Sequence, residues 1–134
     1  MLGAAHALAN PLTAQFNVTH GQAVGLMLPH VVRFNASRLP EVNEWYAELW
    51  RDVAHSRLGK SIAQSDPVDS LAVYVQYLAA RAGLHTELTS FGVTANDVSK
   101  LAVDATKQWT GNFNPCTLQE GDFRQLYIEA LGNP

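Results

Sequence analysis

The sequence predicts an all-α domain of six or seven helices joined by short links. Apolar residues recur every three to four positions along most of the chain, which is the spacing of helices packed against a core. Several of these stretches open with residues typical of a helix N-terminus, and several close at glycine. No stretch alternates apolar and polar residues as a half-buried strand does, and no internal repeat or low-complexity tract is present.

Composition narrows the class of protein further. A chain of 134 residues fits a single domain, residues 1–134, and 47% hydrophobic residues are enough for a real core. A net charge of -3 gives no basic surface, so we expect no nucleic-acid partner. No apolar run is long enough for a membrane span. A single cysteine, Cys116, and the lack of a signal peptide in residues 1–9 favour a cytoplasmic protein.

The first predicted helix covers residues 1–9 and stops at Asn10-Pro11, because the residue before a proline disfavours helical geometry. The helical pattern resumes briefly through Leu12 and Phe16, and residues 17–21 read as a loop. Met1 stands at the start of the pattern with no capping residue before it. Since helices normally open with Ser, Thr, Asp or Asn, we expect this helix to begin further upstream.

Two apolar stretches predict the next helices. Residues 22–34 are apolar on nearly all sides, which indicates a buried helix that Pro29 should kink. A strand is the alternative, although thirteen residues is long for one. Residues 40–58 predict an amphipathic helix that opens at Pro40 and has Gly59 as the residue just past its end. Its apolar stripe comprises Val42, Trp45, Tyr46, Leu49, Trp50, Val53 and Ala54.

The fourth predicted helix opens at Asp66-Pro67, with the aspartate as N-cap and the proline in the first turn. Its apolar residues keep the helical period as far as Ala82, and Gly83 closes it. A connector with a possible single turn at residues 87–90 follows, before Gly92.

Two capping motifs mark the last helices. Residues 94–97 resemble a capping box with Asp in place of Glu or Gln, and the helix after them should run to about Trp109. Residues 110–115 predict a loop rich in Gly, Asn and Pro. Residues 117–120 form a full capping-box pattern, and the final helix should stop at Gly132.

His6 and His20 are the candidate metal ligands, because neutral imidazole binds metals and the pair lies near the break between the first two helices. By themselves they form an incomplete site, since zinc or iron sites normally use three or four protein ligands. The alternative is two polar histidines with no ligand role. His30 lies within a buried stretch and is better explained as a hydrogen-bonded core histidine.

The segments around these histidines resemble the signature of the iron-containing alcohol dehydrogenases. The matching residues are His6-Ala-Leu-Ala-Asn10-Pro11-Leu12, Phe16-Asn17, His20-Gly21, Leu28-Pro29-His30-Val31 and Arg33-Phe34-Asn35. Weaker similarity continues through Asn114-Pro115 and the closing helix, so that the resemblance covers essentially residues 2–131.

The resemblance implies that this chain is the C-terminal helical half of such an enzyme. In the family, an N-terminal α/β domain binds NAD or NADP, and an Asp and three His hold a divalent metal such as Fe²⁺ or Zn²⁺. His6 and His20 match two of those ligands, while the nucleotide-binding domain and the upstream helix that bears the other two are absent. The metal would polarise an alcohol or carbonyl oxygen of a small alcohol or aldehyde for hydride transfer. We expect the chain alone to be inactive.

Three positions depart from the family pattern. Asn10 stands where the family often has a second histidine near the cofactor, which makes it our candidate catalytic position. Asparagine cannot titrate, so a proton relay there would be altered; Asn10 could equally be a cleft-lining hydrogen bonder or a simple helix terminator before Pro11. Thr13 replaces the usual glycine, and Cys116 replaces the usual arginine.

The alternative function is a stand-alone helical module for interaction or oligomerisation, without catalysis. A helical half without its partner domain would expose the apolar surface that once faced that domain. A homo-oligomer could form by covering this inter-domain surface. The three tryptophans, Trp45, Trp50 and Trp109, are expected to be core or interface residues.

Overall fold

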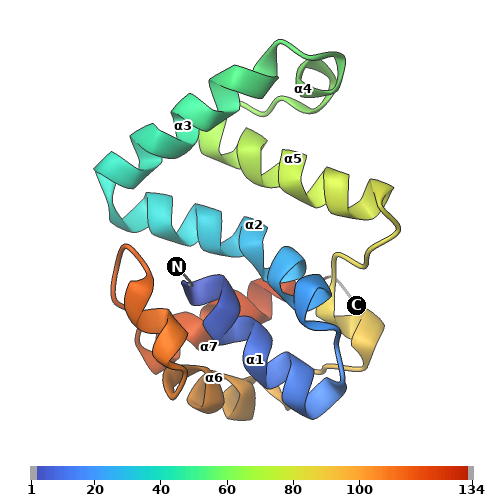
Figure 1. Cartoon of the computed structure of the whole chain (residues 1–134), viewed down its shortest axis with the longest axis vertical. Coiled ribbons are helices and arrows are strands. Elements are labelled where there is room, and N and C mark those ends of the chain that lie inside the picture. Colours follow the sequence, from blue (N-terminus) through green and yellow to red (C-terminus); the bar gives the residue numbers. More distant parts are fainter. Residues whose placement is uncertain (1–2, 133–134) are drawn as a thin grey trace.

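A computed structural model describes residues 3–132 and shows an all-α fold, as the sequence predicts. Within this part of the chain there are seven α-helices and two short 3-10 helices, in the arrangement of Figure 1. Their bounds are α1 Ala4–Phe16, α2 His20–Arg38, α3 Pro40–Ala54, α4 Arg57–Ile62, α5 Pro67–Arg81, η1 Leu88–Phe91, α6 Val98–Thr106, η2 Trp109–Phe113 and α7 Glu120–Ala130. The expected uncapped start at Met1 lies outside the described residues.

Helix α2 is the element that the two halves of the fold share. On one side it packs with α1, α6 and α7 around the larger core, which includes Leu8, Met27 and Leu101. On another side, Val32 and Ala36 meet Val68 and Ala72 of α5 in a smaller core. Figure 1 shows α2 between these two groups, with α3, α4 and α5 on one side of it and α1, α6 and α7 on the other.

The predicted stop at Asn10-Pro11 is wrong, because α1 continues through Pro11 to Phe16. Ala7, Leu8, Ala9 and Leu12 are completely buried, and this burial outweighs the cost of a proline in the helix. The hydroxyl of Tyr127 also donates a hydrogen bond of 2.7 Å to the carbonyl of Leu8, in the turn before Pro11. Helix α1 ends instead at Asn17, which adopts the left-handed conformation at φ 54°.

Helix α2 likewise differs from its predicted limits. It begins at His20 and runs to Arg38, so His20 is the first residue of a helix and not part of a loop. Pro29 lies inside this continuous helix, and the strand alternative is excluded.

The predicted helix 40–58 is two helices. Helix α3 ends at Ala54, and α4 restarts at Arg57 with Ser56 as its N-cap. Gly59 lies inside α4 and does not follow a helix end. A Cβ at this position would stand 2.8 Å from the carbonyl oxygen of Ala54, so glycine allows α4 to fold back closely against the end of α3.

The later helices follow the prediction more closely. Asp66 caps α5 by accepting the amides of Val68 and Asp69, and Gly83 follows the helix at φ 78°. The predicted turn appears as η1. Helix α6 ends at Thr106, earlier than expected, and residues from Trp109 form η2.

The capping box of the last helix is displaced by two residues. Gln119 is the N-cap and Asp122 its partner, whereas the prediction placed them at Thr117 and Glu120. The final helix ends before Gly132, as predicted.

Candidate metal centre

The structure brings His6 and His20 together. Their ring centroids are 5.3 Å apart, with the ring planes tilted by 50°. His6 is half-buried within the first turns of α1, and exposed His20 opens α2. The left-handed turn at Asn17 and the short link after it carry the chain from α1 into α2, so the pair depends on the packing of these two helices.

The spacing of the two rings fits a shared divalent metal. Two imidazoles bound through nitrogen to one ion at about 2.1 Å place their centroids about 5 Å apart. No group of three or more His, Cys, Asp or Glu side chains suited to hold a metal occurs among residues 3–132. Within the described chain, the fit therefore rests on two ligands, and any further protein ligands would have to come from elsewhere.

Burial and charge keep His6 suited to metal binding. Partial desolvation lowers the pKa of His6 below its usual value, and the neighbouring His20 lowers this pKa further. A lowered pKa favours the neutral imidazole, which is the form that has a lone pair for a metal.

Asn10 lies one helical turn after His6 and is held by a residue remote in sequence. Its Nδ2 donates a 2.9 Å hydrogen bond to Oε1 of Gln108, the residue that opens η2. Asn10 also lines a hollow of about 230 Å³, together with Gln15, Lys107 and Gln108. Because α1 continues past it, Asn10 is not a helix terminator; the structure supports the cleft-lining alternative.

Gln108 was not anticipated from the sequence. It stands in the stretch that the sequence assigned to the end of a helix, 98 residues from Asn10, and no local motif marks it. Only the packing of α1 against α6 and η2 reveals this pairing.

His30 is buried as predicted, but the predicted hydrogen bonding is absent. Its Nε2 has no hydrogen-bond partner within residues 3–132, and its Nδ1 stands 4.0 Å from a carboxylate oxygen of Glu129. Burial lowers the pKa of His30, Glu129 partly opposes this shift, and Arg33 adds to it. His30 is therefore a core histidine whose burial favours the neutral form, and it is not part of the facing pair.

A hydrogen-bonded pair of asparagines, buried Asn35 and half-buried Asn114, fixes the start of α1. The side-chain oxygen of Asn114 accepts the backbone amide of Ala4 at 3.3 Å and the amide of Asn35 at 3.2 Å. Its Nδ2 donates to Asn35 and to the carbonyl of Cys116. The sequence singled out Asn35 and Asn114-Pro115 only as parts of a resemblance, and the structure gives them a clear role: they cap and anchor the helix that carries His6.

An all-helical domain with two facing histidines is the class that the fold and the site define. Residues 1–131 match the sequence model described as Fe-containing alcohol dehydrogenase family, C-terminal, and the chain belongs to that family.

Relatives of known function resemble the chain over most of its length. It is 31% identical over 129 residues to the lactaldehyde reductase of Escherichia coli K12, which covers 96% of this chain and 32% of that protein. It is 28% identical over 131 residues to the 1,3-propanediol dehydrogenase of Citrobacter freundii, over 97% of this chain and 32% of that protein. The chain thus spans about a third of the length of these relatives.

Solved structures share the fold. A 1,3-propanediol oxidoreductase superimposes with a TM-score of 0.79 at 23% identity, and an alcohol dehydrogenase from Oenococcus oeni with 0.79 at 24%. Each match covers 96% of this chain and 32% of the other.

Among the helices of residues 3–132, none combines the length and the hydropathy that a membrane span requires.

Proposed function

We propose that this chain is the metal-binding helical half of an NAD(P)-dependent alcohol dehydrogenase, with His6 and His20 as two of the ligands of a divalent ion. The observation that carries the proposal is the pair of facing imidazoles, 5.3 Å apart, in a chain of this family. The names of the relatives, lactaldehyde reductase and 1,3-propanediol dehydrogenase, support a small alcohol or aldehyde as the substrate.

We assign metal binding to His6 and His20 and a positioning role to Asn10. His6 and His20 would hold the ion from α1 and α2, and the lowered pKa of His6 favours the neutral form that binds a metal. When bound, a divalent ion supplies Lewis acidity toward an alcohol or carbonyl oxygen. Asn10, fixed by Gln108, would orient a polar group beside the site through hydrogen bonds. It cannot carry a proton, so proton transfer would have to use another group.

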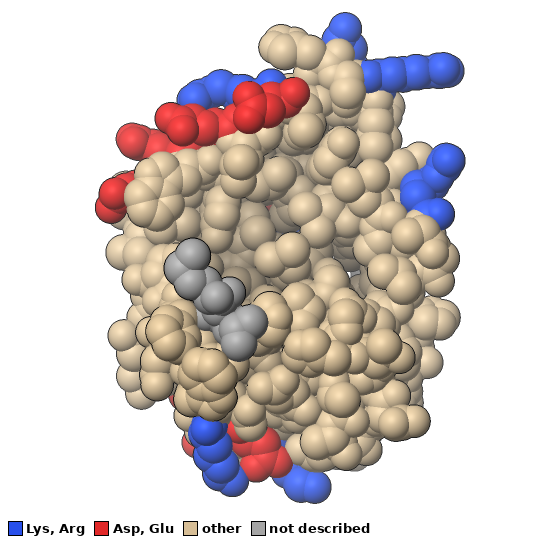
Figure 2. All heavy atoms as spheres, viewed as in Figure 1, with Lys and Arg blue, Asp and Glu red and all other residues tan. Residues whose placement is uncertain are grey.

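The charge distribution around the histidine pair is consistent with a partner domain that packs on this face. In Figure 2 the broad face over α1 and α2 carries few charged side chains, which lie mainly at its edges. A surface poor in charge is typical of one covered by another domain or subunit. We propose that this face would meet the nucleotide-binding domain, which supplies the hydride carrier, and the upstream helix that bears the other two ligands.

Metal binding by the purified chain tests the proposal directly. We expect Zn²⁺ titration to shift the imidazole NMR signals of His6 and His20 together, with weak affinity because only two ligands are present. His20→Ala should abolish the shift at His6, since one imidazole alone binds far more weakly.

The matched control is His55→Ala, which removes an exposed histidine beyond the end of α3. This variant should bind zinc as the wild type does. Equal zinc binding by the wild type and by His20→Ala would refute the role of the pair.

A further inference from the structure

Helix α3 carries a row of carboxylates on its outward face. It buries Val42, Ala47 and Trp50 and leaves its opposite face in solvent. Glu41, Glu44, Glu48 and Asp52 are all exposed on that opposite face. The last three follow at four-residue spacing, and like charges at this spacing destabilise a helix. The spacing of Glu44, Glu48 and Asp52 therefore does not serve the stability of α3 itself.

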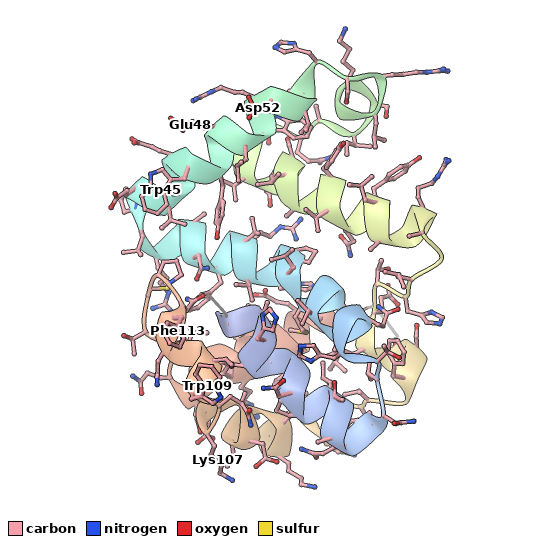
Figure 3. All side chains as sticks on the ribbon, viewed as in Figure 1. Trp45, Glu48, Asp52, Lys107, Trp109 and Phe113 are labelled. Carbon is pink, nitrogen blue, oxygen red and sulfur yellow. The ribbon has the colours of Figure 1, made fainter. Side chains whose placement is uncertain are left out.

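Two large apolar side chains flank the same row. Trp45 is 51% exposed and Leu49 is 53% exposed, although the sequence assigned both to the buried stripe. Figure 3 shows Trp45, Glu48 and Asp52 on the side of α3 that faces away from α5. We call this surface, made by Glu41, Glu44, Trp45, Glu48, Leu49 and Asp52, the acidic ridge. Tryptophan is enriched at protein interfaces, where the charged residues lie mainly at the rim.

A surface of opposite charge lies across α4 and α5. A hollow of about 480 Å³ is lined by Leu58, Tyr77, Leu78, Arg81 and Ala82, and an adjoining hollow adds Arg57. Tyr77 and Leu78 are 36% and 46% exposed. We call this surface the basic hollow. Its volume is enough for a side chain as large as an indole.

Neither surface has its charge neutralised within the chain. None of the ion pairs formed among residues 3–132 includes a carboxylate of the acidic ridge, nor Arg57 or Arg81 of the basic hollow. Figure 2 shows the two groups well separated, with acidic side chains along α3 and basic ones near α4 and the end of α5. Arg51, also on α3, lies on the flank of the row away from Trp45.

We propose that a second copy of this chain docks its acidic ridge in the basic hollow, with Trp45 entering the hollow and Glu48 and Asp52 facing Arg57 and Arg81. Opposite charges would steer and orient the contact, and the apolar side chains would supply most of the affinity. Because the two surfaces differ, the contact is head-to-tail, and a pair of copies keeps one free ridge and one free hollow. Chains of copies, or closed rings, follow. This contact does not depend on the metal or on the face near His6.

Sedimentation velocity of two charge-reversed variants tests the contact. The wild type should self-associate as concentration rises at low salt, and added salt should weaken the assembly by screening. Glu48→Lys and Arg81→Glu should each weaken self-association about tenfold or more. An equal mixture of the two should recover it, because each variant then meets a partner of opposite charge at both surfaces.

The control is Arg124→Glu, a charge reversal of an exposed residue on α7, far from both surfaces. It should associate as the wild type does, and circular dichroism should show all variants folded. A wild type that remains monomeric at about millimolar concentration, where even weak complexes form, would overturn the proposal. A mixture that associates no better than its components would also overturn it. So would an assembly that both charge reversals leave intact and that only Trp109→Ser abolishes, because Trp109 is an exposed tryptophan on η2, outside both surfaces.

Discussion

His30 shows at the scale of one residue how burial without a partner controls a titratable group. Its Nε2 has no hydrogen-bond partner among the described residues, and burial is the main cause of its lowered pKa. A histidine whose pKa is lowered in the folded state binds its proton more readily in the unfolded chain. The stabilising contribution is complete above the unfolded pKa of 6.5 and is lost as the pH falls through the lowered folded value.

We therefore expect acid to destabilise the wild type more than His30→Gln. Urea unfolding at pH 7 and pH 5 gives the two free energies of unfolding, and the difference between them should be smaller in the variant. His55→Gln, at an exposed position, should keep the wild-type difference. An undiminished difference in His30→Gln would show that other groups cause the acid sensitivity.

Asn114 stabilises residues that are far from it in the sequence, because its side chain binds both Ala4 and Asn35. We expect Asn114→Ala to lower the free energy of unfolding by about 2–3 kcal/mol, because it leaves the Ala4 amide and the buried Asn35 unpaired. Asn114→Asp keeps the accepting oxygen but loses the donor to Asn35, so its loss should be intermediate. Asn112→Ala, exposed on η2, should change stability by less than about 0.5 kcal/mol in urea unfolding. Equal losses in all three variants would contradict the capping role.

At the scale of single elements, Gly59 reverses the usual propensity rule. Alanine normally stabilises a helix interior by about 1 kcal/mol relative to glycine. At Gly59, however, a Cβ would meet the carbonyls of Val53 and Ala54. We expect Gly59→Ala to destabilise the fold, whereas Gly25→Ala in α2, where a Cβ meets nothing within 4 Å, should stabilise it. Thermal unfolding of both variants measures this, and a higher melting temperature for Gly59→Ala would refute the close contact.

The same elements show what the sequence could and could not predict. Helical periodicity and local caps, such as Asp66, identified the all-α class and most helices, because these signals depend on neighbouring residues. Pro11 and Gly59 misled the prediction, because the limits of α1 and α3 are decided by burial and by contact with another segment. The facing of His6 and His20 followed from spacing and resemblance, but Gln108 could be found only in three dimensions.

At the scale of the whole molecule, the described fold is a helical unit without a dinucleotide-binding sheet. Residues 3–132 contain no strand, and the chain spans about a third of its relatives. We expect the purified chain, supplied with Zn²⁺, NAD⁺ and a small alcohol, to form no NADH above a protein-free blank, because hydride transfer needs a bound cofactor. A full-length member of the family serves as the positive control in the same absorbance assay. Sustained turnover by this chain would contradict the proposal that the cofactor is bound by a separate nucleotide-binding domain.

The proposed enzymatic role, in place of a stand-alone interaction module, rests on the family of the chain and on relatives named as a reductase and a dehydrogenase. The proposed head-to-tail contact is compatible with either role. It uses α3, α4 and α5, whereas the histidine pair lies on α1 and α2.

The hydrogen bonds that join the two ends of the chain have a consequence for its synthesis. The side chain that caps α1, on Asn114, and the hydroxyl that binds its Leu8 carbonyl, on Tyr127, leave the ribosome more than 100 residues after the backbone groups they bind. Until then the helix that carries His6 lacks both partners. We expect the histidine pair to reach its final geometry only after Tyr127 has left the ribosome, so a translational pause before residue 114 would leave the nascent chain without this site.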